Sequence, residues 1–223
     1  MRIAISGTAN TGKTTLVKAF LKEWGNYTTP DKTYRDLLED STHSKETSKE
    51  LQWDILNFFI DQIQQYEKGD KVILDRCPLD NLVYSMWAYD KGEGDIDEDF
   101  IKKCIPLVRE TLKLYDIIFF IPITKVSPIT IVEDGTRDTD PLYIKEVDSI
   151  FKAIERDWNT NPKCRYCDMD DRPGLIEIFG SPEERLQMIR LYLDVDGDAI
   201  DDTNIMDTLG NIKDSSGLIY PNQ

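Results

Sequence analysis

Residues 7–14 carry the feature that most constrains the fold of this chain. They read Gly-Thr-Ala-Asn-Thr-Gly-Lys-Thr and stand between an apolar run at 3–5 and apolar residues at helical spacing over 15–21. A strand, a glycine-rich turn and a helix in this order form a loop that wraps backbone amides around a phosphate. The position of the motif therefore favours a phosphate site over a glycine-rich surface turn.

Each residue type in this loop suits phosphate binding. Gly7 and Gly12 tolerate backbone angles that other residues resist, so the amides near them can turn inward. Lys13 can neutralise the outer phosphates of a nucleotide, and the Thr14 hydroxyl is a suitable ligand for Mg²⁺. The residues expected to bind the phosphates are Gly7, Asn10, Thr11, Gly12, Lys13, Thr14 and Thr15.

Length and composition indicate one globular domain. The chain has 223 residues, of which 40% are hydrophobic, and no apolar run is long enough to cross a membrane. Because the first residues belong to an expected strand, we predict no secretory signal, no membrane partner and a cytoplasmic protein. The sequence leaves the oligomeric state open, with a homodimer as an alternative to a monomer.

The charge balance bears on the kind of partner. The net charge is −15, from 42 acidic and 27 basic residues. Binding of a nucleic acid over the surface is disfavoured, because such binding depends on clustered Lys and Arg. A small anionic ligand is still allowed, since Lys13 and a few arginines can form a local positive pocket.

A second group of candidate residues follows the apolar run at 72–74. Asp75 ends this run, which is typical of a buried parallel strand whose carboxyl end lies beside the phosphate loop. A carboxylate there can hold a magnesium-bound water, so Thr14 and Asp75 are the predicted metal ligands. Arg76 can bridge a phosphate or hold an acceptor carboxylate. A simple cap of the strand end is the alternative role for Asp75.

Expected strands and helices alternate along the chain, which predicts an α/β fold with a largely parallel sheet. We expect a main domain at 1–193 and an acidic extension or tail at 194–223, in which a small hairpin is the alternative. The acidic stretch fails as a calcium loop, because positions six and twelve would be Ala199 and Ile205 rather than Gly and Glu. Strands are expected at 3–5, 27–29, 71–75, 117–121 and 175–179.

Cys164 and Cys167 form a lone C-x-x-C pattern. A zinc site would lack its third and fourth ligands unless Asp168 or Asp170 served. We therefore favour a turn that carries two reduced thiols over a metal site.

Four sequence blocks occur in the order typical of one enzyme group: 7–15, 34–39, 73–84 and 134–138. In these blocks the chain resembles P-loop small-molecule kinases, nearest to the NadR-like group with its nicotinamide-riboside kinases, then the deoxynucleoside and thymidylate kinases. The resemblance covers residues 1 to about 158. It implies a P-loop NTPase fold with a five-stranded, mainly parallel sheet. It also implies ATP with Mg²⁺ as donor and a nucleoside or nucleotide as acceptor.

The resemblance also implies roles for individual residues. Arg137 would lie in a lid at about 122–140 that closes over the phosphates, where a surface arginine in a turn is the alternative. Relatives place a glutamate three residues before the position of Arg35, but this chain has Lys32 there. Either Asp31 or Asp75 is then the general base, and the choice stays open. The expected catalytic residues are Lys13, Asp75, Arg76 and Arg137.

The acceptor is expected between the helical segments at 32–67 and 79–90. Aromatic rings for stacking and an amide for the edge of a base come from these segments, although residues at helical spacing also form ordinary cores. The expected acceptor-binding residues are Asp31, Arg35, Gln52, Trp53, Phe58 and Tyr84, with Trp87 as a further candidate.

Two other functions compete with a nucleoside or nucleotide kinase. The first is a kinase acting on a hydroxyl of a modified base in DNA, which the acidic charge disfavours. The second is a nucleotide-dependent switch or binding protein without an acceptor, which Asp75, Arg76 and the lid block disfavour.

Overall fold

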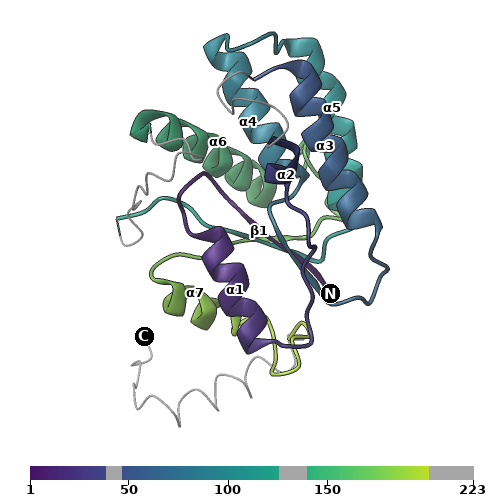
Figure 1. Ribbon diagram of the computed structural model, residues 1–223, viewed down its shortest axis with the longest axis vertical. Helices are drawn as coiled ribbons and strands as arrows, with labels where there is room; N and C mark the ends of the chain where they lie inside the picture. Colours follow the sequence, from purple (N-terminus) through teal and green to yellow (C-terminus); the bar gives the residue numbers. More distant parts are fainter. Residues whose placement is uncertain (39–46, 126–139, 201–223) are drawn as a thin grey trace.

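The computed structural model describes residues 1–38, 47–125 and 140–200. In this part of the chain, four parallel strands form one sheet with helices on both faces (Figure 1). The strands are β1 (Arg2–Ser6), β2 (Val72–Asp75), β3 (Ile117–Phe120) and β4 (Gly174–Glu177). The helices are α1 (Lys13–Glu23), α2 (Tyr34–Leu38), α3 (Lys49–Gln64), α4 (Pro78–Lys91), α5 (Glu98–Leu112), α6 (Pro141–Thr160) and α7 (Pro182–Ile189).

Strand β1 lies inside the sheet, whose order is β2-β1-β3-β4. It pairs in parallel with β2 on one side and with β3 on the other. All of its residues are buried, which explains why it reads as a continuous apolar run rather than as alternation. The chain passes from β1 to β2 on one side and then crosses to β3 on the other side of β1, so a crevice is expected at the carboxyl ends beside β1. The predicted α/β fold with a parallel sheet is confirmed.

The two faces of the sheet support two separate cores. Ala4, Leu74 and Phe120 pack with residues of α3, α4, α5 and α6. Ile3 and Phe119 belong to a second core, together with residues of α1 and α7. Figure 1 shows α1 and α7 on the opposite side of the sheet from α3, α4, α5 and α6. Successive side chains along each strand therefore pack against different sets of helices, one set on each face of the sheet.

The expected fifth strand at 27–29 is not a strand, and this part of the prediction is corrected. Thr28 forms a single parallel bridge with Val72 at the outer edge of β2. Its amide donates to the Lys71 carbonyl, and its own carbonyl accepts from the Ile73 amide, both at 2.9 Å. Pro30 follows two residues later and has no N–H to extend the ladder. One residue thus covers this edge.

Residues 194–200, at the start of the predicted acidic extension, pack against the domain. Leu193 and Ala199 form an antiparallel bridge, which brings the intervening carbonyls toward the end of α1. The Tyr27 hydroxyl donates to the Gly197 carbonyl at 2.5 Å, and the Trp24 indole N–H donates to the Asp194 carbonyl at 2.9 Å. Residues 201–223 lie outside the described residues.

None of the helices in the described ranges combines the length and the hydropathy needed to cross a bilayer.

The contact between Tyr27 and Gly197 should stabilise the fold. Tyr27→Phe removes a buried hydroxyl, since Tyr27 is 4% exposed, and leaves the Gly197 carbonyl without this donor. We expect the free energy of unfolding to fall by about 1 kcal/mol, measured by urea denaturation. Tyr89→Phe is the matched control, because Tyr89 is 46% exposed. Equal stability of the two variants would contradict the docking of residues 194–200.

Candidate active site

The turn between β1 and α1 has the backbone that a phosphate-binding loop requires. Gly7 and Gly12 have φ of 137° and 82°, in the region that favours glycine. A Cβ on Gly7 would stand 2.8 Å from the carbonyl oxygen of Ile121, just beyond β3. Glycine is therefore required at position 7 both by its φ and by the close approach of a neighbouring strand end.

Three segments distant in sequence hold this turn. Arg76 Nη1 donates to the Gly7 carbonyl at 3.2 Å, and Arg185 Nη1 from α7 donates to the Thr11 carbonyl at 2.6 Å. The Thr8 hydroxyl donates to the Ile144 carbonyl in α6 at 3.1 Å. Because both arginines are buried, these contacts hold the backbone of the turn in place. Nothing in the sequence near Arg185 signals this role.

Lys13 is buried at the start of α1. Its Nζ donates to the Thr8 carbonyl at 2.5 Å, so the side chain folds over the turn. The pKa of Lys13 is lowered to about 7, mainly by burial and also by the nearby Arg76 charge, while Asp75 and Asp80 act in the opposite direction. A phosphate anion beside Nζ would restore the preference for the charged form.

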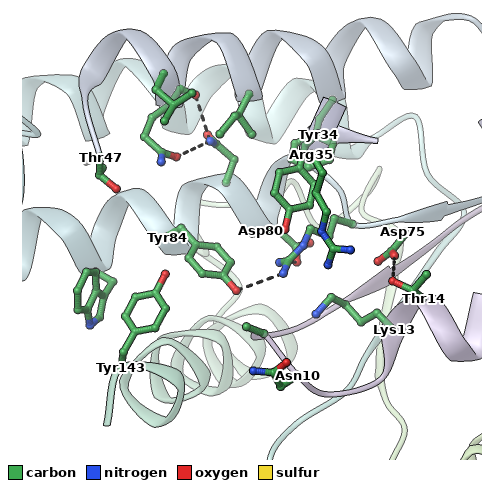
Figure 2. A pocket seen from close by; sticks show the side chains of 18 of the residues that line it. Asn10, Lys13, Thr14, Tyr34, Arg35, Thr47, Asp75, Asp80, Tyr84 and Tyr143 are labelled. Atoms are coloured by element: carbon green, nitrogen blue, oxygen red, sulfur yellow. Dashed lines mark hydrogen bonds and ion pairs between the residues drawn. The ribbon is translucent and has the colours of Figure 1, made fainter. Parts of the chain in front are cut away.

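Thr14 and Asp75 bring two oxygen ligands together. The Thr14 hydroxyl donates to Asp75 Oδ2 at 2.5 Å, which joins the first turn of α1 to the end of β2 (Figure 2). A hydroxyl and a carboxylate side by side next to the phosphate loop fit the oxygen chemistry of Mg²⁺. These residues therefore suit the predicted metal.

Asp80 joins the start of α4 to the end of β1 and the phosphate loop. Helix α4 begins at Pro78 with Cys77 as its N-cap, and Asp80 stands in the first turn. Its carboxylate accepts from Ser6 Oγ at 2.8 Å, Gly7 N at 3.3 Å and Cys77 N at 3.1 Å. Asp80 is 1% exposed, so this carboxylate depends on its donors.

Arg76 is the counterion of Asp80. Its Nη1 donates to Asp80 Oδ1 at 2.9 Å, and both side chains are buried. The guanidinium lies between two tyrosines, with its carbon 5.2 Å from the Tyr34 ring centre and 5.1 Å from the Tyr84 ring centre. Arg76 has a φ of 87°, an unusual value for a residue with a side chain. These contacts hold the arginine at the wall of the site.

One cavity joins the phosphate loop to the helices above the sheet. Figure 2 shows Lys13, Thr14 and Asp75 at one end, and Thr47 and Tyr143 at the other. Its lining comes from the phosphate loop, α1, α2, α3, the end of β2, α4 and α6. The lining residues are Ala9, Asn10, Gly12, Lys13, Thr14, Thr15, Tyr34, Arg35, Thr47, Leu51, Gln52, Ile55, Phe59, Asp75, Arg76, Asp80, Asn81, Tyr84, Trp87 and Tyr143.

The expected acceptor residues divide between the cavity and other surroundings. Arg35, Gln52 and Tyr84 line it, as does the further candidate Trp87. Trp53 instead faces Phe100 of α5, with ring centres 6.2 Å apart. The face of α3 that meets the cavity carries Gln52, Ile55 and Phe59, at spacings of three and four residues, so Trp53 and Phe58 fall off it. Asp31 is exposed and does not line the cavity.

A hydrogen-bonded amide pair forms part of the cavity wall. Asn81 Nδ2 donates to Gln52 Oε1 at 2.7 Å, and Ser85 Oγ donates to the same oxygen at 3.3 Å. With its oxygen bonded twice, Gln52 keeps Nε2 as its remaining polar group. Asn81 and Tyr143 were not predicted. Asn81 lies within the sequence block at 73–84 without a role of its own there, and no pattern marks Tyr143.

The sequence also predicts a lid that carries Arg137 and a turn that carries two reduced thiols. Arg137 and most of the expected lid lie outside the described residues. Cys164 and Cys167 are buried free thiols. Within the described ranges, no group of three or more His, Cys, Asp or Glu residues is arranged to hold a metal ion.

Comparison with known proteins identifies the family. Residues 2–167 match the model of a family described as an AAA domain, which is well over half of the chain. The chain belongs to this family. Among curated proteins, none matches it significantly by sequence. The predicted kinship with P-loop kinases is confirmed at the level of the fold by two solved structures.

The first is NadR in complex with NR, with 16% identity and a TM-score of 0.55 over 99% of this chain. The match covers 53% of the NadR chain, so this AAA-domain protein spans about half of its length. The second is deoxyadenosine kinase from M. mycoides, with 16% identity and a TM-score of 0.56. That match covers 96% of this chain and 100% of the other.

The low pKa of Lys13 predicts coupling between nucleotide binding and protons. With a pKa of about 7, Lys13 is neutral in most molecules at about pH 8. It must bind a proton again to form an ion pair with a triphosphate. Affinity for Mg-ATP should therefore fall as pH rises from about 7 to about 9, with net proton uptake in calorimetry using buffers of different ionisation enthalpy.

Lys13→Arg should remove this pH dependence, because arginine stays charged throughout the range. Equal affinity of the unaltered protein at about pH 6.5 and about pH 8.5 would contradict the prediction.

The ion pair between Asp80 and Arg76 predicts a large effect on stability. Asp80→Asn keeps the shape of the side chain but leaves the buried guanidinium without its counterion. We expect a loss of about 3 kcal/mol or more in the free energy of unfolding, together with weaker nucleotide binding. Asp54→Asn, on the exposed face of α3, is the control and should be nearly neutral. A loss below about 1 kcal/mol for Asp80→Asn would contradict the proposed importance of the pair.

Proposed function

We propose that this protein is an ATP- and Mg²⁺-dependent kinase that phosphorylates a nucleoside or nucleotide. The observation that carries the proposal is the continuity of one cavity (Figure 2). Its near end holds the phosphate loop, Lys13, Thr14 and Asp75. Its far end is lined by neutral aromatic, hydroxyl and amide side chains. A switch protein needs the first end only, whereas a phosphotransferase needs both.

The near end accounts for the donor. The turn at 7–12 would surround the phosphates of ATP, and Lys13 would neutralise charge on the transferred group. Thr14 and Asp75 would hold Mg²⁺, which supplies neutralisation of the phosphate oxygens when bound. Arg76 adds positive charge at the boundary between the two ends. Its contacts with Asp80 and the tyrosines keep that charge in place during reaction.

The far end accounts for the acceptor. Tyr84 and Trp87 offer ring surfaces, and Gln52 offers an amide to the edge of a base. Arg35, on α2, lies between this region and the phosphate loop, where it can contact a sugar hydroxyl or a phosphate of the acceptor. A neutral, partly aromatic wall suits a planar base better than it suits a second triphosphate.

Asp75 is the better candidate for orienting the acceptor hydroxyl. Asp31 does not line the cavity, and the Asp80 carboxylate is occupied by buried donors. Asp75 lies at the boundary of the two ends and is partly buried. Since phosphoryl transfer passes through a loose transition state, a carboxylate that positions the hydroxyl is sufficient.

A panel of acceptors tests the proposed function. Purified protein with Mg-ATP is offered nucleosides, deoxynucleosides, their monophosphates and nicotinamide riboside, and products are separated by mass spectrometry. The two structural neighbours guide the choice, because their structures are those of NadR with NR and of a deoxyadenosine kinase. At least one acceptor should yield a product that gains one phosphate.

Lys13→Ala should lower kcat/KM by about a hundredfold or more, because a preorganised charge on the transferred group is lost. Lys18→Ala is the control on the exposed face of α1 and should keep the activity. Absence of any product would favour a nucleotide-dependent switch. An oligonucleotide is added as a further acceptor, and phosphorylation of the oligonucleotide alone would favour the kinase acting on DNA.

A further inference from the structure

The turn between α4 and α5 makes an unusually close contact with the chain just before α3. At Gly94, which has a φ of 64°, a Cβ would lie 1.7 Å from the carbonyl oxygen of Thr47. This distance is far below any contact that a real Cβ makes, and the obstructing atom belongs to the backbone. No side chain larger than hydrogen fits at Gly94 while Thr47 keeps its place.

Two carboxylates of the same turn hold the next residues. Asp95 Oδ1 accepts from the Lys49 amide at 2.7 Å, and Asp97 pairs with Lys49 Nζ at 2.6 Å. The surface pair contributes little stability alone, but the bond to the Lys49 amide satisfies a free donor at the start of α3. Ile96, between these carboxylates, is buried in the core and anchors the turn.

The contact reaches the cavity through two adjacent residues. Ser48 is the N-cap of α3, and its side chain accepts from the Leu51 amide at 3.1 Å. Thr47 precedes it and lines the cavity at the end opposite Lys13 and Asp75 (Figure 2). The turn at residues 92–97 therefore contacts both the start of α3 and the residue at this end of the cavity.

We propose that Thr47 closes the far end of the cavity, where the acceptor would bind. Gly94 and Asp95 are positioning residues that hold Thr47 there. This inference rests on the proposed kinase function. Residues 92–97 do not line the cavity themselves, so they act on the acceptor through Thr47 and the α3 wall. A shift of this end alters the fit of the base, while the phosphate loop, which belongs to β1 and α1, keeps its geometry.

Two glycines in the same turn provide a matched test. Gly92 and Gly94 have φ of 66° and 64°, so alanine carries the same backbone strain at either position. A Cβ on Gly92 would meet nothing within 4 Å, whereas one on Gly94 would meet Thr47. We expect Gly94→Ala to raise the acceptor KM by about fivefold or more, with the ATP KM within about twofold of the unaltered value. Gly92→Ala should change neither.

Asp95→Ala provides a second test if Gly94→Ala fails to fold. It removes the acceptor of the Lys49 amide without any steric clash, and Asp99→Ala, in the exposed first turn of α5, is its control. The acceptor KM should rise for Asp95→Ala, and hydrogen exchange at the first amides of α3 should become faster. Neither effect is expected for Asp99→Ala.

The outcomes separate this inference from the function on which it rests. An active protein in which Gly94→Ala and Gly92→Ala share one acceptor KM would overturn the positioning role alone. Equal rises in the KM of ATP and of the acceptor would also overturn it, because they indicate general loosening. A protein that phosphorylates no acceptor in the panel would remove both the kinase function and the inference.

Discussion

The site depends on one buried carboxylate. Asp80 receives hydrogen bonds from the end of β1, the first residue of the phosphate loop and the turn after β2, and it forms the ion pair with Arg76. Ser6 and Gly7 lie 74 and 73 residues before Asp80, so this carboxylate joins the end of β1 to the start of α4. Because a buried charge is costly without its partners, the segments are held together as a set.

The pairing of Asp80 with Arg76 explains how the cavity divides into two ends. Arg76 reaches the Gly7 carbonyl on one side and lies between Tyr34 and Tyr84 on the other. The charge of Arg76 is thereby fixed at the boundary between the near end and the far end of the cavity. The side chains that line the far end are neutral. Under the proposed function, a phosphate-bearing ligand and a planar base would therefore meet different surroundings within one cavity, and their relative position would be set before either binds.

Local patterns predicted the loop and the order of the main elements, since a phosphate loop is specified by adjacent residues and a buried strand by its own apolar run. The predictions differ from the structure at two places where local geometry decides, and they miss two roles that depend on distant partners. Thr28 forms only a single bridge, because Pro30 follows it and cannot extend the ladder. Trp53 lies off the cavity wall, because its position on α3 directs its ring toward Phe100. The roles of Asp80 and Arg185 follow from contacts across 73 and 174 residues, which no local pattern encodes.

Positive charge gathers around the phosphate loop, although the net charge of the protein is negative. The chain carries a net charge of −15, yet Lys13, Arg76 and Arg185 are all buried around this turn. Burial lowers the pKa of both Lys13 and Arg185, so the positive charge is held against its own desolvation. Of the three cations, Arg76 has a buried carboxylate as its partner. An anion at the turn would offset the cost for the others, while the acidic remainder of the surface repels extended polyanions. The charge pattern thus fits the proposed small phosphate-bearing ligand through the position of the buried cations rather than through the total charge.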